Sequence, residues 1–253
     1  MMMMGFKVKI RFIFVVIWVF LSLSVWAVDV SAPLQALKSK QYEKAFKQYQ
    51  DLEKQGYQSG DMYQNMAVAA LALGKDVDAI IYIEKALKFK PGNNDLSQLL
   101  SSVLKRKSKI ESEETKSTLV LYFNSFVGIF SVATWVLLSL LCFLAVGWFV
   151  YSGFPDQIKS RFYKLMLILS LSLFFIFSIL SSYRNFQIHN HNTIIITADQ
   201  AILKVSPDKE SPDLSNLVPG SKVYYKDQIN DWWYVSTVYG DEGWIKSVEG
   251  LRL

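Results

Sequence analysis

The chain has 253 residues, of which 51% are apolar and 15% aromatic, and its net charge at pH 7 is +5. This composition is typical of folded proteins and excludes a largely disordered chain. The modest positive charge follows no stripe or arm, so no nucleic-acid partner is expected. The single cysteine, Cys142, excludes an intrachain disulfide and a cysteine-based metal site.

Residues 1–27 have the layout of a secretory signal peptide. Three basic residues, Lys7, Lys9 and Arg11, precede an apolar run over residues 12–26, and Ala27 lies at a candidate cleavage site. Without cleavage, the same segment would be a signal anchor with its basic end in the cytoplasm. In both cases the sequence predicts that the chain from residue 28 onward is carried across the membrane.

Residues 28–105 contain an internal repeat with a period of 34. The period aligns Lys40 with Gly74, Ala45 with Ala79, Phe46 with Ile80, Tyr49 with Ile83, and Leu52 with Ala86. This spacing of small and large apolar residues matches the tetratricopeptide repeat, a pair of antiparallel helices. We expect Gly74 in the turn between the two helices and Pro91 just after the second.

The first copy of the repeat is incomplete. Its second helix is predicted over residues 42–54, whereas its first is cut short by the signal peptide and by Pro33. A capping helix, begun by Asn94 or Asp95, should follow the second copy. Because a free-standing solenoid needs about three repeats, we expect this unit to lean on a partner or on another copy.

Repeats of this kind bind peptides on a concave face lined by the first helix of each pair. That face is predicted to carry Gln64, Asn65, Val68 and Leu71. Asn65 occupies the position at which many peptide-binding repeats place an asparagine that bonds a backbone. Ordinary solvated surface is the alternative interpretation of these four residues.

Residues 106–125 are predicted to form a charged linker. The basic residues Lys107 and Lys109 could touch lipid headgroups, but the acidic residues Glu111 and Glu113 follow at once. A solvated linker of mixed charge is therefore the better interpretation.

Two apolar stretches, residues 126–151 and 164–183, are predicted to be transmembrane helices. Each exceeds the ~18 apolar residues that a helix needs to cross a hydrocarbon core of ~30 Å. The alternative, a pair of buried helices in a soluble protein, fits poorly with runs that are apolar all round. The loop between them, residues 152–163, is basic and should be cytoplasmic. The hairpin would then hold both flanking segments in the periplasm, at the bacterial inner membrane.

Residues 193–253 change to short β-branched and aromatic runs separated by turn signals. Five such runs in about 60 residues predict a small β-barrel. Its landmarks, at residues 203–207, 217–223, 231–235 and 240–245, resemble those of a bacterial SH3 domain.

Aromatic residues dominate the candidate ligand groove of this barrel. Strand alternation predicts that Trp232 or Trp233, but not both, points into the core. Trp244 is expected in the core rather than in a ligand platform. A groove for an extended peptide is predicted from four aromatic residues, namely Tyr224, Tyr225, Trp232 and Tyr234.

No motif with a nucleophile and a base, or with a phosphate-binding loop, is recognised in the sequence. His189 and His191 lie in an asparagine-rich connector with no carboxylate nearby, so a metal site is not expected there. The sequence therefore predicts a protein that is not an enzyme and uses no cofactor.

The order of signal peptide, short repeat unit, two-span hairpin and barrel resembles the BatE-like proteins of the Bacteroides aerotolerance operon family. Residues 56–59, 61–66 and 85–91 carry further likeness. The resemblance implies a multidomain membrane scaffold or adaptor whose partners are von Willebrand factor A-type membrane proteins and, indirectly, a MoxR-type ATPase. The alternative is a cell-envelope sensor whose barrel binds peptidoglycan.

Overall fold

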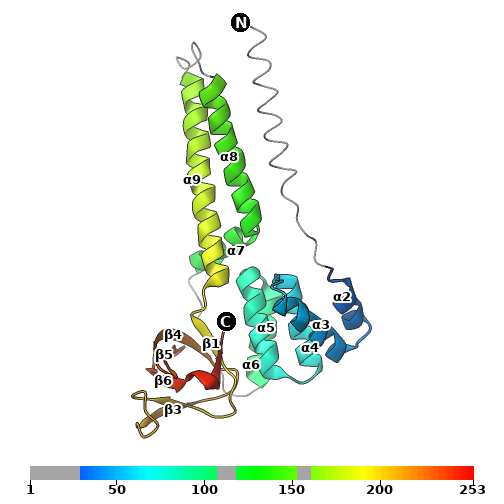
Figure 1. Ribbon diagram of the computed structural model, residues 1–253, viewed down its shortest axis with the longest axis vertical. Helices are drawn as coiled ribbons and strands as arrows, with labels where there is room; N and C mark the ends of the chain where they lie inside the picture. Colours follow the sequence, from blue (N-terminus) through cyan, green and yellow to red (C-terminus); the bar gives the residue numbers. More distant parts are fainter. Residues whose placement is uncertain (1–28, 107–117, 153–160) are drawn as a thin grey trace.

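The computed structural model describes residues 29–106, 118–152 and 161–253. The expected signal peptide, residues 107–117 of the expected linker and residues 153–160 of the expected basic loop lie outside these ranges. The described chain consists of a helical N-terminal region, two long apolar helices and a C-terminal antiparallel sheet (Figure 1).

Over residues 29–106 the N-terminal region has five helices, and each packs on the next along the chain. They are α2 (Ser31–Lys38), α3 (Tyr42–Lys54), α4 (Gly60–Ala72), α5 (Asp76–Phe89) and α6 (Asn94–Arg106). Ala67 on α4 and Ala79 on α5 are fully buried, and their small side chains let the two helices approach closely. Gly74, with φ of +73°, makes the turn between them as predicted.

Side chains at the helix starts fit the places where α4, α6 and α2 begin. The N–H of Met62 donates to Ser59 Oγ at the start of α4, at 3.1 Å. The N–H of Leu96 donates to Asn93 Oδ1 at 2.9 Å, so Asn93, rather than Asn94 or Asp95, caps α6. Pro33 lies in the first turn of the short helix α2, where its missing N–H costs no hydrogen bond.

The first apolar stretch is divided between two helices, unlike the single helix expected over residues 126–151. Helix α7 (Thr118–Gly128) comes first, and α8 (Val132–Ser152) begins after a short break. Ser131 explains the break, because its Oγ accepts the N–H of Thr134 at 3.1 Å and so caps a new helix. Helix α9 (Arg161–His189) extends six residues beyond the expected end at residue 183.

Within the part of the chain that the structure describes, two helices are long and apolar enough to cross a membrane, over Val132–Val150 and Arg161–His189. They pack side by side, with the rings of Phe143 and Phe174 centred 5.6 Å apart. Only 11% of each apolar window is buried within the structure. Such exposed apolar surface favours a lipid environment over the interior of a soluble protein.

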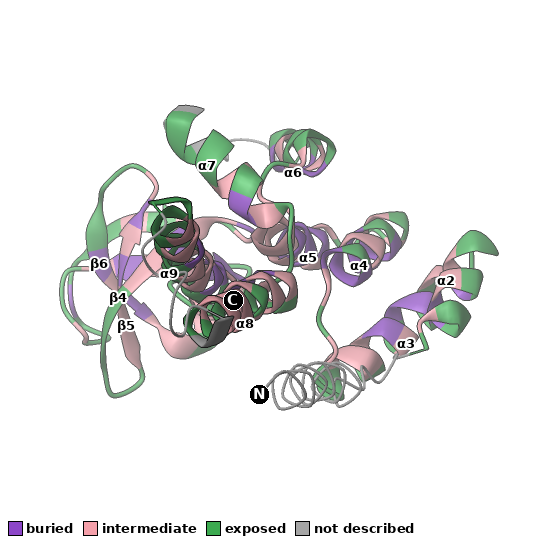
Figure 2. Ribbon diagram, turned by 90° about the horizontal axis from the view of Figure 1, so that it is seen from above, coloured by how far each residue is buried: buried purple, intermediate pink, exposed green. Residues whose placement is uncertain are grey.

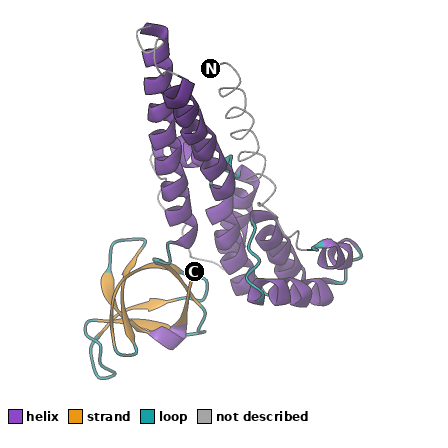
Figure 3. Ribbon diagram, turned by 45° about the horizontal axis from the view of Figure 1, so that its top comes forward, coloured by secondary structure: helices purple, strands orange, loops and turns teal. Residues whose placement is uncertain are grey.

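The C-terminal sheet is antiparallel and has seven strands in the order β3-β2-β6-β5-β4-β1-β7. The strands are β1 (Thr193–Ile196), β2 (Ala201–Lys204), β3 (Asp213–Leu217), β4 (Lys222–Ile229), β5 (Trp232–Thr237), β6 (Glu242–Lys246) and β7 (Gly250–Arg252). Five were expected; β3 is too polar and β7 too short to show a strand pattern in sequence. The sheet curls around its own core (Figure 3).

Gly243 on β6 lies in close contact with residues of the neighbouring strand β2. Fully buried side chains fill the core of the sheet, among them Ile194, Leu203, Val235 and Ile245. A Cβ atom at Gly243 would lie 2.6 Å from the carbonyl oxygen of Lys204 and 2.8 Å from Leu203 Cγ. These distances are too short for any real contact, and a backbone carbonyl in a paired strand cannot move aside.

We therefore expect Gly243→Ala to destabilise the sheet by about 1–3 kcal/mol. Thermal unfolding of the detergent-solubilised protein, followed by near-ultraviolet circular dichroism, measures this effect. Gly147→Ala is the matched control, because a Cβ at Gly147 meets nothing within 4 Å. Equal melting temperatures for the two variants would show that the strands relax around the added methyl group.

The sheet packs against helix α5 rather than standing apart from the helical region (Figure 1). Ile195 of β1 and Leu253, which directly follows β7, are buried within the hydrophobic cluster of the helices. Lys222 Nζ lies 3.1 Å from Glu84 Oε2, with only 15% and 12% of the two side chains exposed. Lys88 Nζ also donates to the carbonyl of Asn190 at 2.6 Å, in the connector that leads into the sheet.

Arg184, near the C-terminal end of α9, joins the long helix to the helical region. Its guanidinium donates to the carbonyls of Lys88 and Phe89, at 2.9 and 2.5 Å, and it is only 2% exposed. These carbonyls belong to the last turn of α5 and have no partner within their own helix. A cation is favoured there, because the C-terminus of a helix carries partial negative charge.

Candidate functional site

Three of the four residues predicted for the concave face of the repeat lie along one side of α4. Gln64, Val68 and Leu71 are spaced four and three residues apart, which places them on one helix face. Val68 is 40% exposed, whereas Leu71 packs partly against the helical core. Gln64 Oε1 accepts a hydrogen bond from Lys90 Nζ at 3.1 Å. This surface of Gln64, Val68 and Leu71, which we call the α4 face, presents a small apolar area beside a polar one.

Asn65 has a role inside the helical region that sequence alone did not indicate. Its Nδ2 donates to the hydroxyl of Tyr49 on α3 at 2.9 Å. Burial raises the pKa of Tyr49, so this phenol remains protonated at neutral pH. The amide thus ties α4 to α3, and one of its two N–H donors is committed to Tyr49.

Behind this face, aromatic rings and one ion pair support α4. Lys85 Nζ lies 2.7 Å from Glu53 Oε1 and 5.4 Å from the ring centres of both Tyr63 and Tyr82. Burial, with a further contribution from the charge of Glu53, raises the pKa of Tyr82 to about 12. The cluster holds α3, α4 and α5 in fixed relation, and its charges are mutually satisfied.

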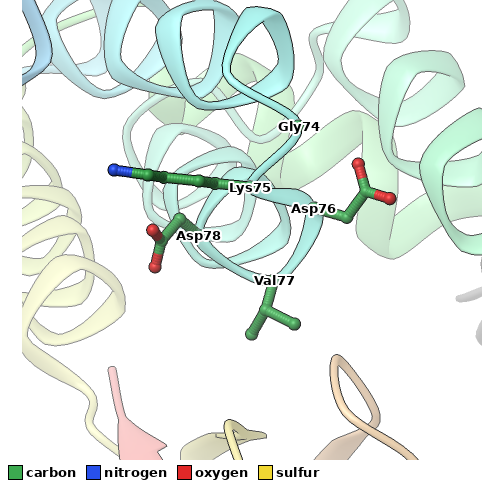
Figure 4. A pocket seen from close by; sticks show the side chains of 5 residues that line it. All are labelled: Gly74, Lys75, Asp76, Val77 and Asp78. Carbon is green, nitrogen blue, oxygen red and sulfur yellow. The ribbon is translucent and has the colours of Figure 1, made fainter. Parts of the chain in front are cut away.

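The turn between α4 and α5 carries a shallow open depression (Figure 4). The side chains of Lys75 and Asp76 point in opposite directions from this turn. Lys75 Nζ lies 3.6 Å from Glu43, and Asp76 pairs with Arg106. Because these charges face partners elsewhere on the helices, they do not converge on a common ligand position.

Strand alternation divides the aromatic residues of the sheet between its two faces. Trp233 packs against the core, whereas Trp232 lies on the outer face beside Lys246, whose Nζ is 5.9 Å from the ring centre. The prediction that only one of these tryptophans faces the core is therefore confirmed.

The expectation that Trp244 lies in the core is wrong. Its neighbour Ile245 is fully buried, so Trp244 points to the opposite face. There its ring centre lies 5.0 Å from that of Tyr234, the residue directly across the strand pair. The outer side of β5 and β6 thus presents Trp232, Tyr234 and Trp244, which we call the aromatic face.

The two tyrosines predicted on β4 point to opposite sides. Tyr225 packs against the core near Trp233, with ring centres 6.4 Å apart, and the Arg252 guanidinium lies 3.7 Å from its ring centre. Tyr224 lies on the other side of the strand. Lys222, two residues earlier, is on that same side, and its Nζ is 5.8 Å from the centre of the Tyr224 ring. Tyr225 is therefore separated from Tyr224, Trp232 and Tyr234.

Charged residues border the aromatic face. The Tyr234 hydroxyl donates to Glu242 Oε2 at 2.8 Å, and Lys226 Nζ donates to the other carboxylate oxygen of Glu242. The hydrogen bond from Lys226, with help from that of Tyr234, holds the pKa of Glu242 below its usual value. The carboxylate is thus ionised at neutral pH and orients the Tyr234 ring beside Trp244.

Among the described residues, no group of three or more His, Cys, Asp and Glu side chains is placed to hold a metal ion. The Nδ1 atoms of the two histidines lie near carbonyl oxygens. That of His189 is 3.0 Å from the carbonyl of Asn185, and that of His191 is 2.6 Å from the carbonyl of Leu253.

Comparison of the chain with models of known protein families, with curated proteins and with solved structures finds no match. The aromatic face, the α4 face and the contacts that join them are therefore the features of the molecule that bear on its function.

Proposed function

We propose that the protein is a non-enzymatic membrane scaffold that binds partner proteins on the periplasmic side of the bacterial inner membrane. In this proposal the helices α2–α6 are a tetratricopeptide unit with a capping helix, and the sheet is an SH3-like barrel. Helices α8 and α9 are a two-span hairpin. Arg161 and Lys164, at the start of α9, favour a cytoplasmic position for the loop that precedes it.

The observation that carries the proposal is the set of buried polar contacts between the three parts. The Glu84–Lys222 ion pair fixes the sheet to α5, and Arg184 fixes α9 to the same helix. A simple membrane anchor needs no such contacts. A scaffold needs them, because two partners can be held in a set geometry only if their binding surfaces are rigidly related.

The aromatic face and the α4 face are the two proposed binding surfaces. Tyrosine and tryptophan offer large apolar area with few rotatable bonds, and they dominate the energetics of protein interfaces. Following the family resemblance, the proposed partners are von Willebrand factor A-type membrane proteins, which would link the scaffold indirectly to a MoxR-type ATPase.

Affinity purification of the full-length protein in mild detergent tests this proposal. We expect von Willebrand-type membrane proteins to be recovered with the native chain. The double variant Trp232→Ala/Tyr234→Ala should reduce recovery by about tenfold or more, since loss of an interfacial aromatic anchor costs about 2 kcal/mol. Tyr239→Ala is the control, because Tyr239 is an exposed aromatic residue outside the aromatic face.

Two results would contradict the scaffold. One is equal recovery with the double variant and with Tyr239→Ala. The other is binding of the purified full-length protein to isolated peptidoglycan, lost in the double variant, with no protein partner recovered from cells. The second result would instead support an envelope sensor.

A further inference from the structure

Helix α7 lies in the chain between the helical region and α8, the first long apolar helix. Its axis runs across the axes of α8 and α9. In the view along the long axis, α8 and α9 are seen end-on while α7 is seen from its side (Figure 2). Helix α7 has eleven residues and none of them is charged. Its direction and composition set it apart from both of its neighbours.

One side of α7 is apolar and exposed. Leu119, Tyr122, Phe123 and Phe126 are 80%, 72%, 47% and 51% exposed. Their spacing of three, four and seven residues places them on one side of a helix. Phe130, in the break before α8, adds to this surface and is 40% exposed.

The other side of α7 is held by the protein. Val127 is fully buried. Asn124 Oδ1 accepts hydrogen bonds from the Tyr183 hydroxyl at 2.9 Å and from Gln187 Nε2 at 2.7 Å, both on α9. Gly128 lies so close to Pro91 that a Cβ atom there would be 2.8 Å from the proline ring. The orientation of α7 about its own axis is therefore set by contacts.

With this orientation, the apolar side of α7 touches α8 at one end and is otherwise exposed. The Phe126 ring lies 6.1 Å from that of Trp135 on α8, and the Phe130 ring lies 5.2 Å from it. Trp135 in turn lies 5.8 Å from Phe177, which is well inside the apolar part of α9. Trp135 is only 2% exposed, so these rings pack the C-terminal part of α7 onto α8 and α9. Phe126 and Phe130 remain 51% and 40% exposed beside Val136 of α8, which is 49% exposed.

The contacts of Asn124 also set the level of α7 along α9. From Leu165, the first residue of the apolar part of α9, to Tyr183 the helix rises about 27 Å. A hydrocarbon core is about 30 Å thick, so Tyr183 falls at its outer boundary. Asn124 is bonded to Tyr183 and Gln187, which places α7 at the same boundary.

We propose that α7 is an interfacial helix whose apolar side is buried in the outer leaflet, at the junction of headgroups and acyl chains. This inference rests on the proposed function, in which α8 and α9 cross the bilayer. Because α7 has no charged residue, it binds lipid through apolar area and does not require anionic headgroups. It thereby holds the helical region at a fixed height on the membrane.

A fluorescence-quenching experiment on the full-length protein in phosphatidylcholine vesicles tests the inference. In a Cys142→Ser background, an environment-sensitive fluorophore is attached at Tyr122→Cys, at Leu141→Cys or at Lys209→Cys. These positions lie on α7, in the middle of α8 and on the outside of the sheet domain. Quenchers are placed either near the headgroup end of the acyl chain or near its tip.

We expect the Tyr122→Cys probe to be quenched several-fold more by the shallow quencher than by the deep one, and the Leu141→Cys probe to show the reverse order. The Lys209→Cys probe should be quenched by neither. Quenching at Leu141→Cys with none at Tyr122→Cys would overturn the inference, because the α7 surface would then be covered by protein. No quenching at Leu141→Cys would instead overturn the proposed membrane-spanning hairpin.

Discussion

Replacing Glu84 by glutamine is expected to loosen the junction between the sheet and helix α5 by about 3–5 kcal/mol. The Glu84 carboxylate neutralises Lys222, and both side chains are largely buried. It also faces Lys88, whose pKa is lowered mainly by burial and partly by the positive charge of Lys222. Without Glu84, the partly buried ammonium group of Lys88 faces that of Lys222 without the carboxylate between them, and the pKa of Lys88 should fall further.

Hydrogen exchange of the β1 and β4 amides, in the full-length protein in detergent, measures this effect locally. A single unfolding free energy is poorly defined for a chain of several parts, so a local probe is preferable. A change of about 3 kcal/mol corresponds to exchange faster by about 100-fold. Glu43→Gln is the matched control, because the Glu43–Lys75 pair is exposed and is worth less than about 1 kcal/mol. Equal exchange in both variants would mean that apolar contacts alone hold the junction.

Replacing Arg184 by methionine should detach the C-terminal end of α9 from the last turn of α5. Hydrogen bonds from a charged donor contribute about 1.5–3 kcal/mol each, and two buried carbonyls lose theirs in this variant. Part of this loss is offset, because the buried Nε atom of Arg184 has no partner among the described residues and its burial is costly. We expect a net loss of about 3 kcal/mol.

Exchange of the amides around Phe89 and Gln187 reports on the Arg184 contact. Arg184→Lys is the informative companion variant, because an ammonium group lacks the planar fork that reaches two carbonyls at once. It should lie between the native protein and Arg184→Met. Protection in Arg184→Met equal to that of the native protein would show that apolar packing, and not the guanidinium, joins α9 to α5.

The kinds of element could be predicted from the sequence because each has a local pattern. The 34-residue period identified α4 and α5, and Gly74 marked the turn between them. Unbroken apolar composition identified α8 and α9. Short β-branched and aromatic runs identified five of the strands. All of these patterns depend on neighbours in the chain, which a single sequence displays directly.

Contacts between distant segments could not be predicted in this way. Glu84 and Lys222 are separated by 138 positions, and nothing local to either residue marks the other as its partner. The break before α8 was also missed, because Ser131 caps a helix within a run that is otherwise apolar. From its apolar composition alone, that run was predicted to be a single helix.

In the candidate site, the alternation of side chains along each strand, more than the residue type, determines which aromatic residues share a face. Tyr224 and Tyr225 are adjacent in a strand, so they could not share a groove, and only the register of β5 with β6 showed that Trp244 joins Tyr234. The position of Asn65 on α4 was predictable from the repeat. Its bond to Tyr49 depends on how α3 packs, which the repeat pattern does not specify.

The uninterrupted length of α9 has a mechanical consequence. In the proposed orientation, Arg184 and Asn124 hold the outer end of this helix against the rest of the protein, so α9 cannot slide along its axis to match a thinner bilayer. A mismatch in thickness is then relieved by tilting. Because Arg184 fixes the helical region to α9, and the Glu84–Lys222 pair fixes the sheet to α5 of that region, a change in bilayer thickness would tip both binding surfaces relative to the membrane plane.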